Sequence, residues 1–157
     1  MMPRQDADLA GLGVLDSLSP AHRALVAAAA VPVRFGARER LFREGTRAEG
    51  CWLIHDGCVA LDLTIPGRGE VVVQTLGPGD VLGWSWLIPP YEWHFGAITT
   101  RETTATKLDT GQLRRLASED PQFGYALALA LFQACAQRLQ ATRARLLDLY
   151  GSPNDPH

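Results

Sequence analysis

Residues 76–95, LGPGDVLGWSWLIPPYEWHF, form the most distinctive stretch of the chain. A turn-forming segment at 77–80 precedes three of the four tryptophans and a Pro-Pro pair at 89–90. A Pro-Pro step disfavours both regular helix and central strand, so we expect an irregular but stiff segment. Aromatic side chains on such a backbone either wall a ligand pocket or fill it. Which of these two structures the stretch forms decides the function.

The bulk composition is typical of one soluble globular domain. The chain has 157 residues, of which 46% are hydrophobic and 20% charged, and it is long enough to bury a core. Its net charge of -2 gives no electrostatic reason to expect nucleic acid as a partner. No signal peptide is indicated, and no window approaches the roughly 20 apolar residues that a membrane span needs. We therefore expect a cytoplasmic protein without membrane contact.

The three cysteines, Cys51, Cys58 and Cys135, do not form an even-numbered disulfide framework. Reduced thiols are therefore expected, and the sequence leaves their role open. Cys51, His55 and Cys58 are close in sequence, but a turn at 56–57 separates them and their spacing matches no standard zinc site. The chain also carries no paired histidines and no recognisable nucleophile or phosphate-binding motif. We expect no metal site, no cofactor and no catalytic centre.

Turn signals divide the first two thirds of the chain into one helix and a series of short strands. Ser19 is a good N-cap and Pro20 suits the first helical position, which predicts a helix over 20–30. From residue 33, short runs between glycine turns are typical of antiparallel strands. The expected strands include 33–35, 40–43, 51–55, 58–64, 70–76 and 97–108.

Two turns predict hairpins between these strands. The Asp-Gly pair at 56–57 is the strongest short hairpin signal, so we expect 51–55 to pair with 58–64. The Pro-Gly-Arg-Gly sequence at 66–69 predicts a second hairpin. Seven or eight short strands at regular spacing are typical of a barrel or jelly roll.

The last third of the chain is predicted to be helical. A short helix is expected over 110–118, and an acidic segment with proline at 118–121 favours the start of a second one. Its apolar residues recur every four positions, with a second stripe beside them: Phe123, Leu127, Leu131, Cys135 and Leu139, then Ala128, Phe132 and Ala136. A helix from Pro121 to Leu149 would extend about 43 Å, beyond the span of a small barrel. Part of its apolar surface should overhang, so we expect a homodimer through Pro121 to Leu149.

Three segments resemble the cyclic nucleotide-binding domains of the catabolite activator (Crp/Fnr-like) family. They are VRFGARERLFREG at 33–45, CWLIHDGCVAL at 51–61 and LGPGDVLG at 76–83, where the phosphate-binding cassette of the family begins. The similarity covers about residues 12–150. It implies a mainly β fold with flanking helices, a double-stranded β-helix (jelly-roll) barrel plus a long C-terminal helix that forms the dimer.

The resemblance also implies a domain organisation. We expect a single domain over residues 1–150, with the barrel at about 31–109, the C-terminal helices at about 110–150 and a tail at 151–157. Transcription factors of this family continue into a helix-turn-helix domain. This chain ends shortly after Tyr150, so we expect no such domain and no direct DNA binding.

The cassette departs from the family pattern at both of its polar anchors. Relatives place a glutamate for the ribose after the glycine matched by Gly83, and Trp84 stands there in this chain. The Arg-Ser/Thr-Ala segment that binds the cyclic phosphate falls, without gaps, on Trp93, His94 and Phe95. Charge-assisted hydrogen bonds contribute about 1.5–3 kcal/mol each, so their loss removes about two decades of affinity or more. We therefore expect no tight binding of cAMP or cGMP unless another cation substitutes.

Neither Arg68 nor Arg101 is placed by the motif as that substitute, and a protonated His94 would replace it only in part. The arginines from 138 to 145 are expected to form a solvated helix face. The candidate ligand-binding residues are Gly83, Trp84, Ser85, Trp86, Tyr91, Trp93, His94 and Phe95. Core packing is favoured for Trp86 and Phe95 and ligand contact for Trp84 and Trp93, and the two interpretations are even for His94.

These observations predict a regulatory domain that binds a small molecule, either nucleotide-like or aromatic, in an aromatic-walled pocket. Its long helix would transmit ligand occupancy to a partner. Two alternatives remain open: a cAMP-binding regulator with an atypical binding pose, and a ligand-free dimerisation or interaction module.

Overall fold

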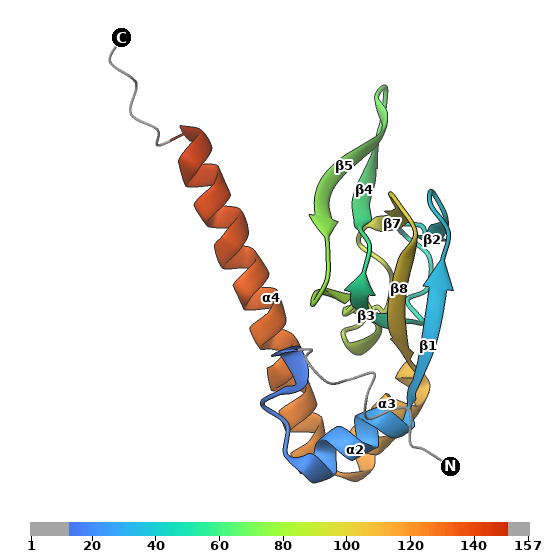
Figure 1. Cartoon of the computed structure of the whole chain (residues 1–157), viewed down its shortest axis with the longest axis vertical. Helices are drawn as coiled ribbons and strands as arrows, with labels where there is room; N and C mark the ends of the chain where they lie inside the picture. Colours follow the sequence, from blue (N-terminus) through green and yellow to red (C-terminus); the bar gives the residue numbers. More distant parts are fainter. Residues whose placement is uncertain (1–12, 151–157) are drawn as a thin grey trace.

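Within residues 13–150, eight strands form two antiparallel sheets of four strands each (Figure 1). The strand order is β1-β8-β3-β6 in the first sheet and β2-β7-β4-β5 in the second. The strands are β1 (Ala30–Phe35), β2 (Arg40–Phe42), β3 (Cys51–Asp56), β4 (Val59–Ile65), β5 (Gly69–Leu76), β6 (Val81–Leu82), β7 (Gly96–Thr99) and β8 (Thr103–Leu108). This is the strand order of a jelly roll, and the predicted fold class is confirmed.

The computed structural model describes residues 13–150, except for the side chain of Tyr150. The predicted tail at 151–157 and the first part of the N-terminal segment lie outside the described residues. The helical elements are η1 (Gly13–Leu15), α2 (Pro20–Ala28), η2 (Ser85–Leu87), α3 (Thr110–Glu119) and α4 (Pro121–Tyr150). Within the described part of the chain, no helix has the length and apolar character required to cross a membrane.

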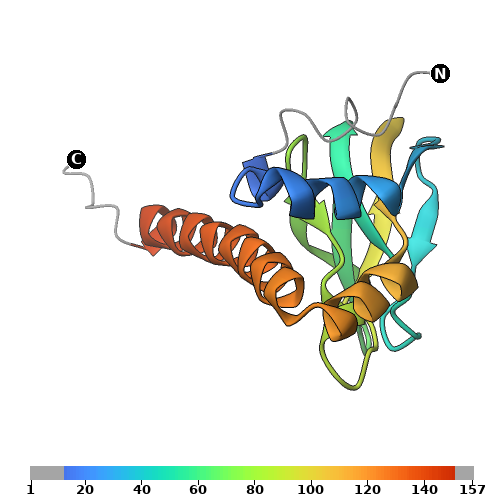
Figure 2. The ribbon, with the colours of Figure 1, turned by 90° about the horizontal axis from the view of Figure 1, so that it is seen from below.

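The helices α2 and α3 lie together at one end of the strands, and α4 begins there (Figure 1). From this end, α4 projects to one side, away from the strands (Figure 2). The caps explain where each helix begins. The Ser19 hydroxyl accepts a hydrogen bond from the His22 amide, and Asp109 and Asp120 cap α3 and α4 in the same way.

The first helix ends earlier than predicted, at Ala28 instead of residue 30. Ala30 already belongs to β1, where it lies opposite Leu108. Because β8 supplies this pairing from far along the chain, no local signal at 28–30 marks the boundary.

The hairpin predicted at Asp56-Gly57 is wrong, because the strands on either side belong to different sheets. β3 pairs with β6 and β8, whereas β4 pairs with β5 and β7. Gly57 has a φ of 111°, and a Cβ atom there would lie 2.6 Å from Cα of Thr103. The pair therefore forms a tight corner that carries the chain from one sheet to the other, next to the start of β8.

The single strand predicted over 97–108 is also two strands in different sheets. β7 belongs to the second sheet and β8 to the first, and the chain crosses between them at 100–102. The second predicted hairpin is confirmed, since Ile65 lies opposite Gly69 across the β4–β5 turn.

The apolar stripe predicted for the last helix is buried only over its first half. Phe123, Leu127 and Leu131 of the first stripe are buried in the core and Leu139 at its far end is exposed, whereas Phe132 shows that the second stripe faces outward already in the first half. The distal part of α4 thus carries apolar side chains that the rest of the described chain does not cover.

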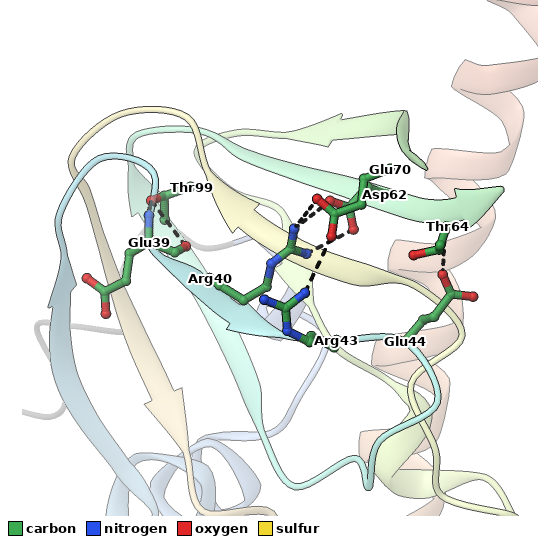
Figure 3. A network of polar contacts seen from close by, with 8 residues as sticks. All are labelled: Glu39, Arg40, Arg43, Glu44, Asp62, Thr64, Glu70 and Thr99. Atoms are coloured by element: carbon green, nitrogen blue, oxygen red, sulfur yellow. Dashed lines mark hydrogen bonds and ion pairs between the residues drawn. The ribbon is translucent and has the colours of Figure 1, made fainter. Parts of the chain in front are cut away.

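A buried ion pair joins strands of the second sheet (Figure 3). Both terminal nitrogens of Arg40 on β2 donate to the two carboxylate oxygens of Asp62 on β4, at 2.9 Å each. Arg40 Nη2 also lies 3.2 Å from Oε1 of Glu70, and Arg43 contacts the same carboxylate. The hydrogen bonds with Asp62 raise the pKa of Arg40.

Candidate functional site

Six of the eight candidate ligand residues lie around one cavity inside the barrel, here called the barrel pocket. They are Gly83, Trp84, Ser85, Trp93, His94 and Phe95. The remaining wall comes from strands β2, β4, β5 and β6 and from α4, including Phe42, Gln74, Leu131 and Arg138. The other two candidates, Trp86 and Tyr91, line none of the three pockets described here.

Trp86 is a core residue, as the sequence favoured. Its side chain is fully buried, and the indole nitrogen donates to the Gly83 carbonyl at 3.1 Å. The neighbouring thiol of Cys51 is also fully buried, and burial raises its pKa to about 12 against an opposing hydrogen bond with Trp86. This part of the cassette therefore belongs to the hydrophobic core.

Tyr91 points toward α3 and not into the barrel pocket. Its ring lies beneath the guanidinium of Arg114, with 4.4 Å between the Arg114 Cζ atom and the ring centroid. This is cation–π geometry. The sequence predicted Tyr91 in the pocket wall, and this prediction is wrong. The contact between Tyr91 and Arg114 instead joins the cassette to α3, the helix that leads into α4.

Trp93 fills much of the barrel interior. Its side chain is 6% exposed, and it stacks on Phe42 with ring centroids 3.7 Å apart and an interplanar angle of 11°. The remaining space in the barrel pocket is about 70 Å³, whereas pockets for small ligands usually measure about 300–1,000 Å³. Trp93 therefore packs in the core and lines the pocket at the same time.

Trp84 and His94 form a stacked pair at the mouth of the barrel pocket. Their ring centroids are 5.4 Å apart, with an interplanar angle of 24°. His94 Nδ1 lies 3.2 Å from the Ser85 hydroxyl, so Ser85 holds the orientation of the imidazole. Trp84 is half-buried, whereas His94 is exposed.

A larger and mostly apolar groove, the outer groove, adjoins the barrel pocket between the cassette and α4. Its volume is about 640 Å³. Trp84 and Phe95 line both spaces, so they separate the barrel pocket from the outer groove. On the α4 side, the groove is lined by apolar residues that include Leu131, Phe132 and Leu139.

A third pocket, of about 400 Å³, is more polar and lies between η1, the β5–β6 region and α4. Its walls include Gln74, Asp80, Gln133 and Arg138. Arg138 and Gln74 are common to all three pockets, and the three spaces therefore meet at these two side chains.

Arg138 was expected on a solvated helix face, and the structure corrects this. Its side chain is only 22% exposed, and Nη2 lies 3.5 Å from Oδ1 of Asp80 and 3.5 Å from the Val81 carbonyl. The sequence contained a signal that was missed. Arg138 follows Leu131 by seven residues and Cys135 by three, which places it on the buried side of the helix.

No group of three or more histidine, cysteine or acidic side chains within residues 13–149 is arranged to hold a metal ion. The barrel pocket and outer groove offer aromatic surfaces, the guanidinium of Arg138, the imidazole of His94, the thiol of Cys135 and a few neutral polar groups. Such a site suits binding.

The sequence matches the cyclic nucleotide-binding domain family over residues 32–120, which is more than half of the chain. It is 26% identical over 144 residues to the CRP-like cAMP-activated global transcriptional regulator of Mycobacterium tuberculosis. This alignment covers 92% of the chain and 62% of that regulator, so the chain spans less than two thirds of the relative's length.

Solved structures show the same fold at low sequence identity. A cyclic nucleotide-binding domain from Methylobacillus flagellatus matches with a TM-score of 0.78 at 17% identity, covering 98% of this chain and 88% of that chain. The catabolite activator protein of Thermus thermophilus matches with a TM-score of 0.64 at 24% identity, covering 88% and 62%. Together with the sequence match, the jelly roll, the glycine turns and the long helix place the chain in the cyclic nucleotide-binding domain family of regulatory proteins.

Proposed function

We propose that the chain is a ligand-sensing regulatory domain that does not bind cAMP or cGMP tightly in the usual pose of its family. The observation that carries this proposal is the filling of the barrel pocket. Aromatic side chains occupy the positions of the expected carboxylate and guanidinium, and about 70 Å³ of space remains. A cyclic nucleotide would have to displace Trp93 and leave its ribose and phosphate poorly paired.

The energetic cost of these missing partners is large on the scale of ligand affinities. Each lost charge-assisted hydrogen bond weakens binding by about 1.5–3 kcal/mol, and about 1.4 kcal/mol corresponds to a factor of ten in affinity. Displacing Trp93 would add the cost of breaking its stack on Phe42. The two effects act together against a cyclic nucleotide.

The ligand site that the geometry favours joins the barrel pocket to the adjoining part of the outer groove. The groove, at about 640 Å³, lies within the range of about 300–1,000 Å³ typical of small-molecule sites. A modest movement of Trp84 or Phe95 would connect the two spaces. The aromatic and aliphatic walls favour a ligand with a largely apolar body.

We also propose that α4 forms a homodimer with the α4 of a second copy. Four of its exposed apolar side chains lie seven residues apart, as along a coiled-coil seam. The seam consists of Tyr125, Phe132, Leu139 and Leu146, which are 71%, 67%, 50% and 52% exposed. Phe132 and Leu139 also line the outer groove, so a ligand in the groove would contact the helix that forms the dimer. This shared helix face is how ligand occupancy would be transmitted.

A ligand-free dimerisation module is the second candidate function. The small volume of the barrel pocket and the tight stack of Trp93 on Phe42 favour it. The two candidates differ in one observable property, namely whether any small molecule binds the outer groove.

Two titrations test the proposal. In calorimetry with cAMP and with cGMP, we expect no binding in the micromolar range, and micromolar affinity for either nucleotide would contradict the proposal. A fragment screen by NMR should then find ligands that shift the indole resonances of Trp84 or Trp93. If no fragment binds there, the chain is the dimerisation module.

A further inference from the structure

Arg138 is the only charged side chain that lines the barrel pocket or the outer groove among the residues that the structure describes. The two linings contain no aspartate, glutamate or lysine. The surface that the cassette and α4 enclose is therefore mostly apolar, with Arg138 as its permanent positive charge and His94 as the other basic side chain. That charge comes from α4 and not from the cassette, the segment that carries the arginine in the family pattern.

The guanidinium of Arg138 is only weakly engaged. Arginine has five N–H donors, and among residues 13–149 the two polar contacts of Arg138 both use Nη2 at 3.5 Å, near the outer limit of a hydrogen bond. The contacting carboxylate of Asp80 is held by the preceding turn, because its Oδ2 accepts the Gly77 amide at 2.8 Å. Nη1 and Nε of Arg138 therefore have capacity left for another acceptor.

The surroundings of Arg138 strengthen its interaction with an anion. The side chain is mostly buried, and a partly buried charge pair is screened less by water and salt than an exposed pair. Its charge already affects the site, because it lowers the pKa of the neighbouring Cys135 thiol against the larger effect of burial, which raises it. A bound anion would be placed between this guanidinium and the aromatic walls.

We propose that Arg138 is the anion anchor of this site, and that the ligand class is an aromatic monocarboxylate. This inference rests on the proposed ligand-sensing function. The carboxylate pairs with the guanidinium, for which two parallel hydrogen bonds are the favoured geometry. The ring lies in the outer groove against Trp84, Phe95 and Leu131.

The pocket discriminates against a sugar phosphate despite its positive charge. A cyclic nucleotide also carries one negative charge, but its ribose adds polar groups that need partners when buried. In the shared wall, the neutral hydrogen-bonding groups are the amide of Gln74, the indole N–H of Trp84 and the thiol of Cys135, and Ser85, His94 and Thr142 each line only one of the two spaces. A ligand that is apolar outside its acid group meets this constraint.

The test uses a matched pair of probes, indole-3-acetate and its neutral amide, indole-3-acetamide. Calorimetry or NMR titration of the full chain should give an affinity for the acid about tenfold or more above that for the amide. Arg138→Gln should abolish this preference and leave the affinity for the amide within about twofold, because that affinity comes from the aromatic walls. Arg138→Lys should retain part of the preference.

Arg143→Gln is the matched control, because Arg143 is exposed on the same helix and lines none of the three pockets. It should bind both probes as the unaltered chain does. Circular dichroism and thermal unfolding of each variant would identify a loss of folding, and Arg138→Lys keeps the test valid if Arg138→Gln is unstable.

Each other outcome has a definite meaning. Equal affinity for acid and amide, or a preference that survives in Arg138→Gln, overturns the anchor and leaves the ligand-sensing function in place. Binding of cAMP more tightly than indole-3-acetate overturns the ligand class. If neither indole probe binds but molecules from the fragment screen do, the ligand class is again wrong. If neither the probes nor any fragment binds, the proposed function fails together with the inference.

Discussion

At the scale of single residues, Trp93 decides how much space the barrel offers. Its indole stacks on Phe42 at 3.7 Å between centroids, and the more distant ring of Trp52 lies 6.3 Å away. A side chain held in this way contributes to folding and excludes ligand at the same time. Removing it should separate the two effects.

We expect Trp93→Ala to lower the free energy of unfolding by about 3–5 kcal/mol, as for other buried aromatic truncations. It should also leave a cavity large enough for free indole, because apolar cavities in protein cores bind apolar molecules of matching size. Thermal unfolding with and without added indole measures both effects. Indole should raise the melting temperature of Trp93→Ala and leave that of the unaltered chain nearly unchanged.

Trp84→Ala provides the control, because Trp84 is only half-buried at the pocket mouth. Its loss should cost less stability and create no enclosed space for indole. Equal losses in the two variants, with no rescue in either, would show that Trp93 does not fill the barrel.

The thiols provide a second test of burial at the residue scale. Burial raises the pKa of Cys51 from its ordinary value of 9.0 to about 12. Cys51 is therefore protonated in the folded chain at pH 8, and its thiolate, the reactive species, is scarce. Iodoacetamide at pH 8 should modify Cys58, which is half-buried, well before Cys51, as measured by mass spectrometry of peptides.

The raised pKa of Cys51 also predicts the direction of the pH dependence. The folded state holds the Cys51 proton more tightly than the unfolded state does. The stability that comes from this tighter proton binding is fully present below pH 9, and it is lost as the pH rises toward 12. Denaturant unfolding at pH 8 and pH 10 should show a smaller alkaline loss in Cys51→Ala than in the unaltered chain. Rapid labelling of Cys51 without denaturant would contradict the assignment.

At the scale of elements, Gly96 on β7 allows the ion pair between β2 and β4 to form. Gly96 lies opposite Asp62, and a Cβ atom there would overlap Oδ1 of Asp62 and lie 2.6 Å from Nη1 of Arg40. The ion pair between Arg40 and Asp62 therefore passes over β7 at Gly96, where no side chain blocks it.

Gly96→Ala should lower the free energy of unfolding by about 1–3 kcal/mol, the usual cost of overpacking a buried site. Gly77→Ala is the control, since a Cβ atom at Gly77 would meet no atom within 4 Å. Its effect should stay within about 0.5 kcal/mol. Denaturant unfolding of both variants measures the difference, and equal stability would show that the ion pair shifts at little cost.

The elements also show which parts of the fold the sequence could predict. Local signals located most strands and the last two helices, because turns, caps and apolar periodicity act over a few residues. Sheet membership was missed at Asp56-Gly57 and within 97–108, because pairing across the two sheets depends on strands far away in the chain. Six candidate residues of the site lie together. Arg138 was missed, because its spacing from Leu131 and Cys135 indicates only the buried side of α4, and the approach of α4 to the cassette depends on tertiary packing.

At the scale of the whole molecule, α4 extends beyond the barrel (Figures 1 and 2). The exposed apolar seam continues along this part of the helix to Leu146. Residues 139–149 are exposed on all sides. An isolated helix of this length with exposed leucines is only marginally stable in water. In the proposed homodimer, a second α4 packed along the seam would supply the missing burial.

Leu139→Glu should therefore convert a dimer into a monomer, because two charges per dimer would be buried in the seam without partners. Gln140→Glu adds the same charge at a neighbouring position that is not part of the seam, and it should leave the dimer intact. Sedimentation velocity over a range of concentrations distinguishes the two. The folded barrel should survive in both variants, because Leu139 is half exposed in the single chain. A chain that sediments as a monomer at high concentration, or a Leu139→Glu variant that remains dimeric, would contradict the seam and with it the proposed route from ligand to partner.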